Sequence, residues 1–268
     1  MNEITINELF SGIGAVRKAF IILGISHRVV GISEIDKYAI ASYKAMYGDT
    51  FNYGDISKVD KLKYADLWVY GFPCQDISVA GNMQGIVKGK TRSGLLFEVE
   101  RVLETAVTDG EPPKYLLMEN VKNLVGKRFK PDFDRWLQKL DDLGYHNYWK
   151  VLDAQNFGIP QHRERVFCVS IRKDLKQGFE FPDEVTLTTC MQAYLESEVD
   201  DKYFIAQLTA DKLIKDNARQ AEKGNGFRFA PLKASDRSVA STVTTRADRR
   251  ESNWIDYGET TDNDRNNS

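Results

Sequence analysis

The chain has 268 residues, of which 42% are apolar and 28% are charged, and its net charge is −2. These values are typical of an ordinary globular domain, with room for a smaller second one. No apolar run approaches the roughly 20 residues that cross a bilayer, and the sequence MNEITINELFSGIG lacks the features of a secretory signal. We therefore expect a cytoplasmic protein without a membrane segment. Three widely separated cysteines argue against a disulfide framework and against a Cys-rich zinc site.

Short apolar runs alternate with amphipathic stretches through the first two-thirds of the chain. The pattern predicts strands at 4–10, 27–33, 65–71 and 114–120. Helices are predicted between them, at 15–23, 37–47, 94–107 and 133–143. Two further strands, at 148–154 and 165–171, are expected to be antiparallel and to lie beyond the parallel core. This alternation predicts an α/β fold, with a mostly parallel sheet covered by helices on both faces.

The sequence pattern changes after Pro182, where Ser, Thr, Asp and Gly become frequent. We therefore predict one domain at 1–182 and a smaller one at 183–268, whose polar tail is expected to be disordered. Between Asp211 and Arg250 there are ten Lys and Arg against five Asp and Glu. A basic segment on an otherwise acidic body fits a module that faces DNA, and a solvated surface is an equally good interpretation.

A glycine-containing turn follows the first predicted strand and opens the first helix, with the sequence Phe10-Ser11-Gly12-Ile13-Gly14. Such glycines permit a tight turn and a close approach of ligand to backbone. Glu34 follows the second strand, where a carboxylate can accept the hydroxyls of a ribose. Asp55 and Ile56 suit an adenine amino group and ring face. Similar turns also occur as plain structure, and a dinucleotide enzyme is a rival interpretation.

Residues whose side chains suit catalysis follow two neighbouring strands. The strand at 65–71 runs into Phe72-Pro73-Cys74-Gln75, which places a cysteine on a loop at the carboxyl edge of the sheet. The next strand ends in Glu119-Asn120-Val121. Further on, Gln161-His162-Arg163-Glu164-Arg165 puts two arginines on one face of an extended segment. Cys168, in an apolar run, is instead expected to be a buried small side chain.

The segments FSGIG, PCQ, ENV and QHRER, in this order, resemble the motif set of the cytosine-5 DNA methyltransferases over roughly residues 4–171. The resemblance implies the Rossmann-like fold of methyltransferases that use S-adenosylmethionine, and a catalytic domain at 1–182. It implies that the thiolate of Cys74 adds to carbon 6 of a cytosine flipped out of double-stranded DNA. Arg163 and Arg165 would lower the pKa of Cys74, and Arg165 would also hold the base oxygen. Glu119 would contact ring nitrogen 3 and the amino group, with a proton retained through burial.

The same resemblance implies S-adenosylmethionine as methyl donor, and nothing in the sequence suggests a metal. The implied cofactor-binding residues are Phe10, Ser11, Gly12, Ile13, Gly14, Glu34, Ile35, Asp55, Ile56, Pro73 and Leu96. Residues 78–93 would form a mobile loop that closes over DNA. The predicted DNA contacts are Gln75, Ser78, Arg92, Arg228 and Arg246, and the region 183–268 would be part of a recognition domain.

The chain departs from the family pattern near its C-terminal end. Residues 227–255 resemble part of the variable recognition region, but no Asn-Ser motif of the kind that ends these enzymes follows. We expect a split enzyme completed by a second polypeptide or a truncated, often prophage-borne product; a complete chain with a substitute for the missing helix is the third possibility. A restriction system or an orphan or phage enzyme is the implied setting. A transfer RNA methylase of the same family, a non-catalytic DNA-binding remnant and a dinucleotide oxidoreductase remain as alternatives.

Overall fold

The computed structural model describes residues 3–74, 86, 92–222, 232–233, 239–242 and 255–256. It divides into two compact units. The first unit comprises Met1–Leu152 and Glu164–Pro182, and the second comprises Asp153–Arg163 and Asp183–Ser268. The sequence pattern did not anticipate that 153–163 would group with the C-terminal residues. The catalytic and recognition roles of the predicted domains stay predictions.

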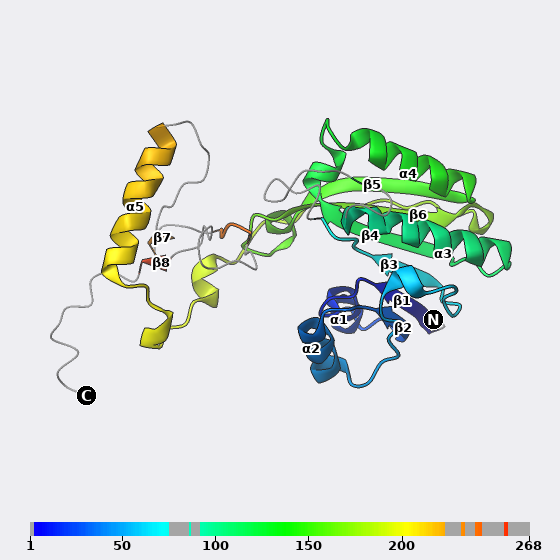
Figure 1. The fold of residues 1–268 in the computed structure, drawn as a ribbon, viewed down its shortest axis with the longest axis horizontal. Coiled ribbons are helices and arrows are strands. Elements are labelled where there is room, and N and C mark those ends of the chain that lie inside the picture. The colour runs from blue at the N-terminus through cyan, green and yellow to red at the C-terminus, as the bar shows by residue number, and fades with distance from the viewer. Residues whose placement is uncertain are drawn as a thin grey trace. The chain divides into compact units, whose positions relative to one another are not determined.

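A six-stranded mixed sheet forms the centre of the first unit (Figure 1), with strand order β2-β1-β3-β4-β6-β5. β1 pairs in parallel with β2 and β3, β3 pairs in parallel with β4, and β6 is antiparallel to β4. The strands are β1 (Ile4–Leu9), β2 (His27–Ser33), β3 (Leu67–Tyr70), β4 (Tyr115–Val121), β5 (Tyr145–Asp153) and β6 (Glu164–Arg172). The predicted α/β fold with a mostly parallel sheet is therefore confirmed.

Helices pack against this sheet, and their order in the chain alternates with the strands. They are α1 (Ala15–Ile22), α2 (Lys37–Tyr47), α3 (Leu96–Thr108) and α4 (Lys130–Asp142). The second unit contributes α5 (Gln207–Glu222) and two short parallel strands, β7 (Leu232–Lys233) and β8 (Ile255–Asp256). Among the residues that the structure describes, no helix has the length and apolar character needed to cross a bilayer.

Alternating side chains of β3 pack on opposite faces of the sheet. Trp68 and Tyr70 belong to a large buried cluster that includes the apolar residues of α3 and α4. Leu67 and Val69 point the other way, into a smaller cluster packed by side chains of α1. Successive residues of a strand face opposite sides, so helices cover both faces, as the sequence predicted.

The register of the parallel strands brings three chain segments to one edge of the sheet. Leu9 of β1 pairs with Tyr70 of β3, and Tyr70 in turn pairs with Met118 of β4. The loops after these three strands therefore leave the sheet side by side. The chain order reverses between β1 and β3, and ligands of open α/β sheets bind at the carboxyl ends of strands at such a switch point.

Candidate active site

The glycine loop after β1 is fixed by hydrogen bonds from its backbone N–H groups to residues at the end of β2. Phe10 and Gly12 both have positive φ angles, of 55° and 53°. The N–H of Phe10 donates to the carbonyl of Ser33 (2.7 Å), and the N–H of Gly12 donates to Oε2 of Glu34 (2.9 Å). The predicted glycine loop and the predicted ribose-binding carboxylate are therefore in direct contact.

Glu34 organises the turn that leads into α2. Its Oε1 accepts hydrogen bonds from the N–H groups of Ile35 (2.8 Å) and Asp36 (2.9 Å). Asn52 fixes the Glu34 backbone, because its Oδ1 accepts from the Glu34 N–H (3.2 Å) and its Nδ2 donates to the Glu34 carbonyl (3.0 Å). Asn52 was not predicted as a site residue, and no motif marks it in the sequence.

The surroundings of the glycine loop fit a polar ligand with an apolar ring. Oγ of Ser11 is buried without a hydrogen-bond partner, and a buried hydroxyl in this state calls for one. A side-chain carbon built on Gly12 would meet nothing within 4 Å, so the space beside the turn is open. Ile35 is 72% exposed beside Glu34 and offers an apolar surface. These features suit the predicted nucleoside-containing methyl donor.

The remaining predicted cofactor residues divide between loop and core. Asp55 caps a short helix through hydrogen bonds from the hydroxyl (2.8 Å) and N–H (3.0 Å) of Ser57, which lower the pKa of Asp55. Ile56 and Leu96 are buried in the large core cluster together with Leu9. Both side chains are buried, so neither is open surface.

The loop that carries Cys74 is fixed by two side chains from other segments. Nδ2 of Asn120 donates to the carbonyl of Phe72 (3.0 Å), and Oγ of Ser93 donates to the carbonyl of Pro73 (2.7 Å). Both donors are buried. Cys74 is half-buried and packs against the large core cluster. Ser93 was not singled out in the sequence, whereas Asn120 belongs to the ENV motif but had no assigned task.

Glu119 and Arg165 form an ion pair beside this loop, with 3.1 Å between Oε1 and Nε. A side-chain carbon built on Gly71, three residues before Cys74, would lie 3.5 Å from Oε2 of Glu119. The cysteine loop, the carboxylate and one arginine thus converge at the carboxyl edge. The side chain of Glu119 is 37% exposed, and retention of its proton through burial stays a prediction.

Cys168 differs from Cys74 in its setting. It is buried in the core, and burial raises the pKa of its thiol to about 11, against a small lowering by Ser170. A thiol in this state is a poor nucleophile at neutral pH. Its placement agrees with the buried small side chain that the sequence predicted.

The other predicted residues lie elsewhere or outside the description. Arg163 belongs to the second unit and is described with it below. Only the backbone of Arg92 is described, at the start of a short 3-10 helix. Gln75, Ser78, Arg228 and Arg246 lie outside the described residues. Within the described part of the chain, no three His, Cys, Asp or Glu side chains group as metal ligands would, and a metal-free mechanism stays a prediction.

The known proteins that this chain resembles in sequence or in structure are described as methylases or methyltransferases. The family model described as C-5 cytosine-specific DNA methylase matches residues 4–268. The type II methyltransferase M2.ScrFI of Lactococcus lactis subsp. cremoris is 37% identical over 267 residues, with 78% of this chain and 72% of that protein covered. The orphan methyltransferase M.Rho11sI of Bacillus phage rho11s is 31% identical, with 83% of this chain and 50% of that protein covered.

Solved structures show the same fold at lower sequence identity. The Dnmt2 methyltransferase of S. pombe has a TM-score of 0.70 and 19% identity, with 98% of this chain and 79% of that chain covered. The chain spans half to about three quarters of the length of the curated relatives it matches.

Proposed function

Because the chain belongs to the family of C-5 cytosine-specific DNA methylases, we propose that it methylates carbon 5 of cytosine in double-stranded DNA. The observation that supports this most directly is the convergence at one sheet edge. The glycine loop follows Leu9, and the Cys74 loop follows its pairing partner Tyr70. The ion pair of Glu119 with Arg165 lies on the next strands. A methyl donor and a cytosine bound there would lie beside each other.

Cys74 supplies the nucleophile in the proposed mechanism. Carbon 5 of cytosine is too weak a nucleophile to attack a sulfonium methyl group, so the Cys74 thiolate first adds to carbon 6. The electrons of the 5,6 double bond then form the bond from carbon 5 to the methyl group, and the carbon-sulfur bond of the donor breaks. Loss of the carbon 5 proton to a base restores the double bond and expels the thiolate.

Glu119 and Arg165 act on the base rather than on the methyl group. Glu119 contacts ring nitrogen 3 and the amino group, and favours protonation of the ring as the thiolate adds. Arg165 holds the base oxygen, and its charge favours the thiolate form of Cys74. Arg163, the other arginine of the same motif, is proposed to act in the same reaction. The flipped base would cover the exposed part of Glu119, which the protein alone leaves open.

S-adenosylmethionine supplies an electrophilic methyl group when it is bound. We propose that Ser11 and Gly12 hold its methionine end, since the Ser11 hydroxyl lacks a partner and the space at Gly12 is open. Glu34 would take the ribose, while Ile35 would cover the adenine and Asp55 would complete its pocket. Phe10, Ile13, Gly14, Ile56, Pro73 and Leu96 would shape the same site.

The basic residues of the C-terminal region would contact DNA phosphates and base edges. Arg228 and Arg246, with Gln75, Ser78 and Arg92 from the loop after Cys74, are the proposed contacts. Relatives named as type II and as orphan phage methyltransferases support a restriction system or a phage as the setting. DNA as substrate would place the protein in the cytoplasm of such a cell.

A second polypeptide is a further part of the proposal. No residue of α1 is buried, and Ile22 and Leu23 at its end are 72% and 70% exposed. Contiguous exposed apolar side chains of this kind mark interaction surfaces. We infer that further polypeptide covers this face in the active enzyme.

The test is covalent trapping with duplex DNA that contains 5-fluorocytosine in many sequence contexts. Fluorine replaces the proton that must leave, so an active enzyme stays joined to DNA in the presence of S-adenosylmethionine. We expect the full chain, together with the polypeptide that completes it, to give an adduct that maps to Cys74, and Cys74→Ser to give none under the same conditions. Cys190→Ser is the matched control and should trap as the wild type does.

Each other outcome has a defined meaning. An adduct with transfer RNA but not with DNA would replace the proposed substrate by the alternative one. No adduct with the folded chain alone, but an adduct after co-expression with the neighbouring reading frame, would support the second polypeptide. No adduct in either case, or trapping by Cys74→Ser, would refute the proposed function.

A further inference from the structure

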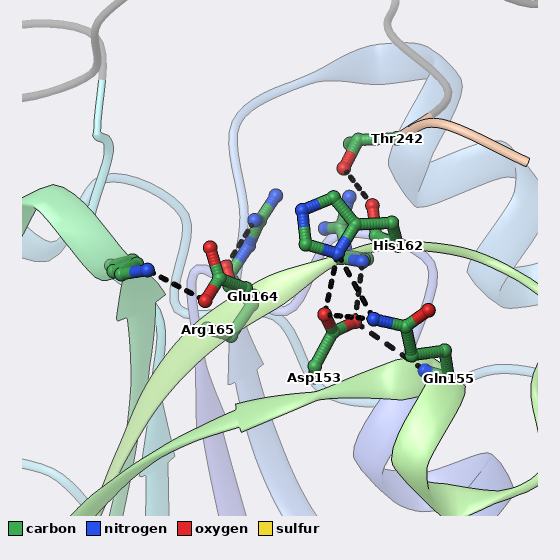
Figure 2. A network of polar contacts seen from close by, with 8 residues as sticks. Asp153, Gln155, His162, Glu164, Arg165 and Thr242 are labelled. Carbon is green, nitrogen blue, oxygen red and sulfur yellow. Dashed lines mark hydrogen bonds and ion pairs between the residues drawn. The ribbon is translucent and has the colours of Figure 1, made fainter.

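Asp153, the last residue of β5, is the centre of a polar network in the second unit (Figure 2). Its carboxylate accepts hydrogen bonds from the backbone N–H of Arg163 (2.9 Å) and from Nε2 of Gln155 (2.8 Å). Nδ1 of His162 lies 2.5 Å from its Oδ2. The side chain is only 11% exposed. Burial alone would raise the pKa of Asp153, but these hydrogen bonds outweigh it and lower the pKa.

These contacts close the loop between β5 and β6. The N–H of Ala154 donates to the carbonyl of Arg163 (3.2 Å), and the Arg163 N–H returns to Asp153. The two ends of the loop are thus joined by one backbone bond and one charged side-chain bond. Hydrogen bonds to an ionised acceptor are about twice as strong as neutral ones, so Asp153 contributes the stronger link.

A local capping role does not account for this arrangement. Asp153 also accepts from the backbone N–H of Gln155, as the cap of a short 3-10 helix, but at 3.4 Å. That distance is long for an N–H···O hydrogen bond, whereas the Arg163 contact has the usual length. Of its two backbone donors, Asp153 therefore bonds better to the one at the distant end of the loop than to the one in its own turn.

Residues from the C-terminal region extend the same network. The N–H of Ala240 donates to the carbonyl of Pro160 (2.8 Å), and the N–H of His162 donates to the carbonyl of Ala240 (2.7 Å). Oγ1 of Thr242 donates to the carbonyl of His162 (2.8 Å), as Figure 2 shows. His162 is thus held on one side by Asp153 and on the other by residues 240–242.

We propose that Asp153 is a positioning residue for Arg163 in cytosine methylation, an inference that rests on the proposed function. Its carboxylate fixes the backbone from which the Arg163 side chain leaves. Without it, the Arg163 N–H and the His162 ring lose their buried acceptor, and the loop is closed by one neutral backbone bond. Small displacements of a positioned charge are enough to reduce catalysis strongly.

Three variants of the full chain test this proposal. Asp153→Ala removes every acceptor, and Asp153→Asn keeps a neutral oxygen that can still accept from the Arg163 N–H. Asp174→Asn is the matched control, because Asp174 is an exposed acid that pairs with Arg172 on the first unit. Steady-state methylation gives kcat and KM for each, and amide hydrogen exchange of the peptide 154–163 reports on the loop directly.

We expect Asp153→Ala to lower kcat about ten- to hundred-fold, with KM for S-adenosylmethionine nearly unchanged, in a protein that stays folded at the assay temperature. Asp153→Asn should recover most of that loss, and Asp174→Asn should match the wild type. Exchange of 154–163 should rise in Asp153→Ala alone. An unchanged kcat, or a loss of activity caused by unfolding at the assay temperature, would overturn the proposal.

The hydrogen-exchange measurement distinguishes a failure of the positioning role from a failure of the proposed function. A wild-type chain that stays inactive even together with the polypeptide that completes it would count against the proposed function and leave the loop result intact. In that case, unchanged exchange in Asp153→Ala would also overturn the positioning role, whereas increased exchange would retain the structural link and remove only its catalytic purpose.

Discussion

Gly12 and Gly14 share a left-handed backbone but have different surroundings. Their φ angles are 53° and 78°. A side-chain carbon on Gly12 would meet nothing within 4 Å, whereas one on Gly14 would lie 2.6 Å from ring carbons of both Tyr43 and Tyr47. Tyr47 also donates a hydrogen bond to the Gly14 carbonyl (2.8 Å). The first glycine leaves room for a ligand, and the second allows two rings of α2 to pack beneath the loop.

This contrast predicts different results for the two alanine variants. Gly12→Ala should lower the free energy of unfolding by about 1–2 kcal/mol, the cost of a left-handed alanine. Gly14→Ala has the same backbone cost and also places a side chain against the tyrosine rings. Such overpacking should lower the free energy of unfolding by about a further 1–3 kcal/mol. Besides this smaller loss of stability, Gly12→Ala should weaken binding of S-adenosylmethionine in a protein that still folds. Urea denaturation and calorimetric titration measure both effects, and equal destabilisation by the two variants would contradict the interpretation.

Among single residues, the sequence identified the groups that we propose to carry the chemistry but not the side chains that hold them. The motifs identified Cys74, Glu119 and Glu34 because each follows a strand that the apolar pattern locates. Asn52 and Ser93 could not be predicted, since each bonds to the backbone of a residue 18 or 20 positions away. No local pattern encodes such a contact, which depends on how a loop returns to the sheet.

Asp66 joins three strands at the opposite edge of the sheet. Its Oδ2 accepts from the backbone N–H (3.0 Å) and the hydroxyl (2.6 Å) of Thr5, at the start of β1. Its Oδ1 pairs with Nζ of Lys114, next to β4, at 2.8 Å. Burial would raise the pKa of Asp66, but the bonds to Lys114 and Thr5 outweigh it and hold the pKa well below its usual range.

A depressed pKa makes this contribution to stability dependent on pH. The ionised form is favoured by folding, so its contribution is present above the unfolded pKa of about 3.9 and is lost as the pH falls through the lower folded value. We expect Asp66→Asn to be destabilised at pH 7 and at pH 5, and to approach the wild type below about pH 4. Denaturation curves at several pH values test this, and a constant difference down to acid pH would argue against the ion pair.

The apolar spacing located the helices of the first unit, with bounds of differing accuracy. The predicted helix at 37–47 has the bounds of α2. α4 begins at Lys130 rather than Phe133, because the prediction started at the first apolar residue and ignored the favourable proline of the first turn. α5 was missed although its apolar residues recur at helical spacing, because the region after Pro182 is rich in polar residues, and Leu208 and Ile214 of the helix are exposed.

At the scale of the whole molecule, charge is distributed unevenly along the chain. The ten basic residues between Asp211 and Arg250 predict DNA binding that weakens steeply with salt. Arg246→Gln should lower the slope of log K against log salt by about one, since one phosphate contact is lost. Arg28→Gln is the control, because Arg28 pairs with Glu3 on the surface of the first unit. Equal slopes for both variants and the wild type would exclude Arg246 as a phosphate contact.

The excursion of residues 153–163 into the second unit has a consequence for how such a protein could change its specificity. The chain passes between the units at three points rather than one, and Val185 and Ala240 both bond to the excursion. If the second unit reads DNA as proposed, it could not be exchanged by a cut at Pro182 alone, because the loop before Arg163 would lose its partners. Grafting between relatives would need to transplant both pieces together, so recombination should leave matched pairs of these two segments.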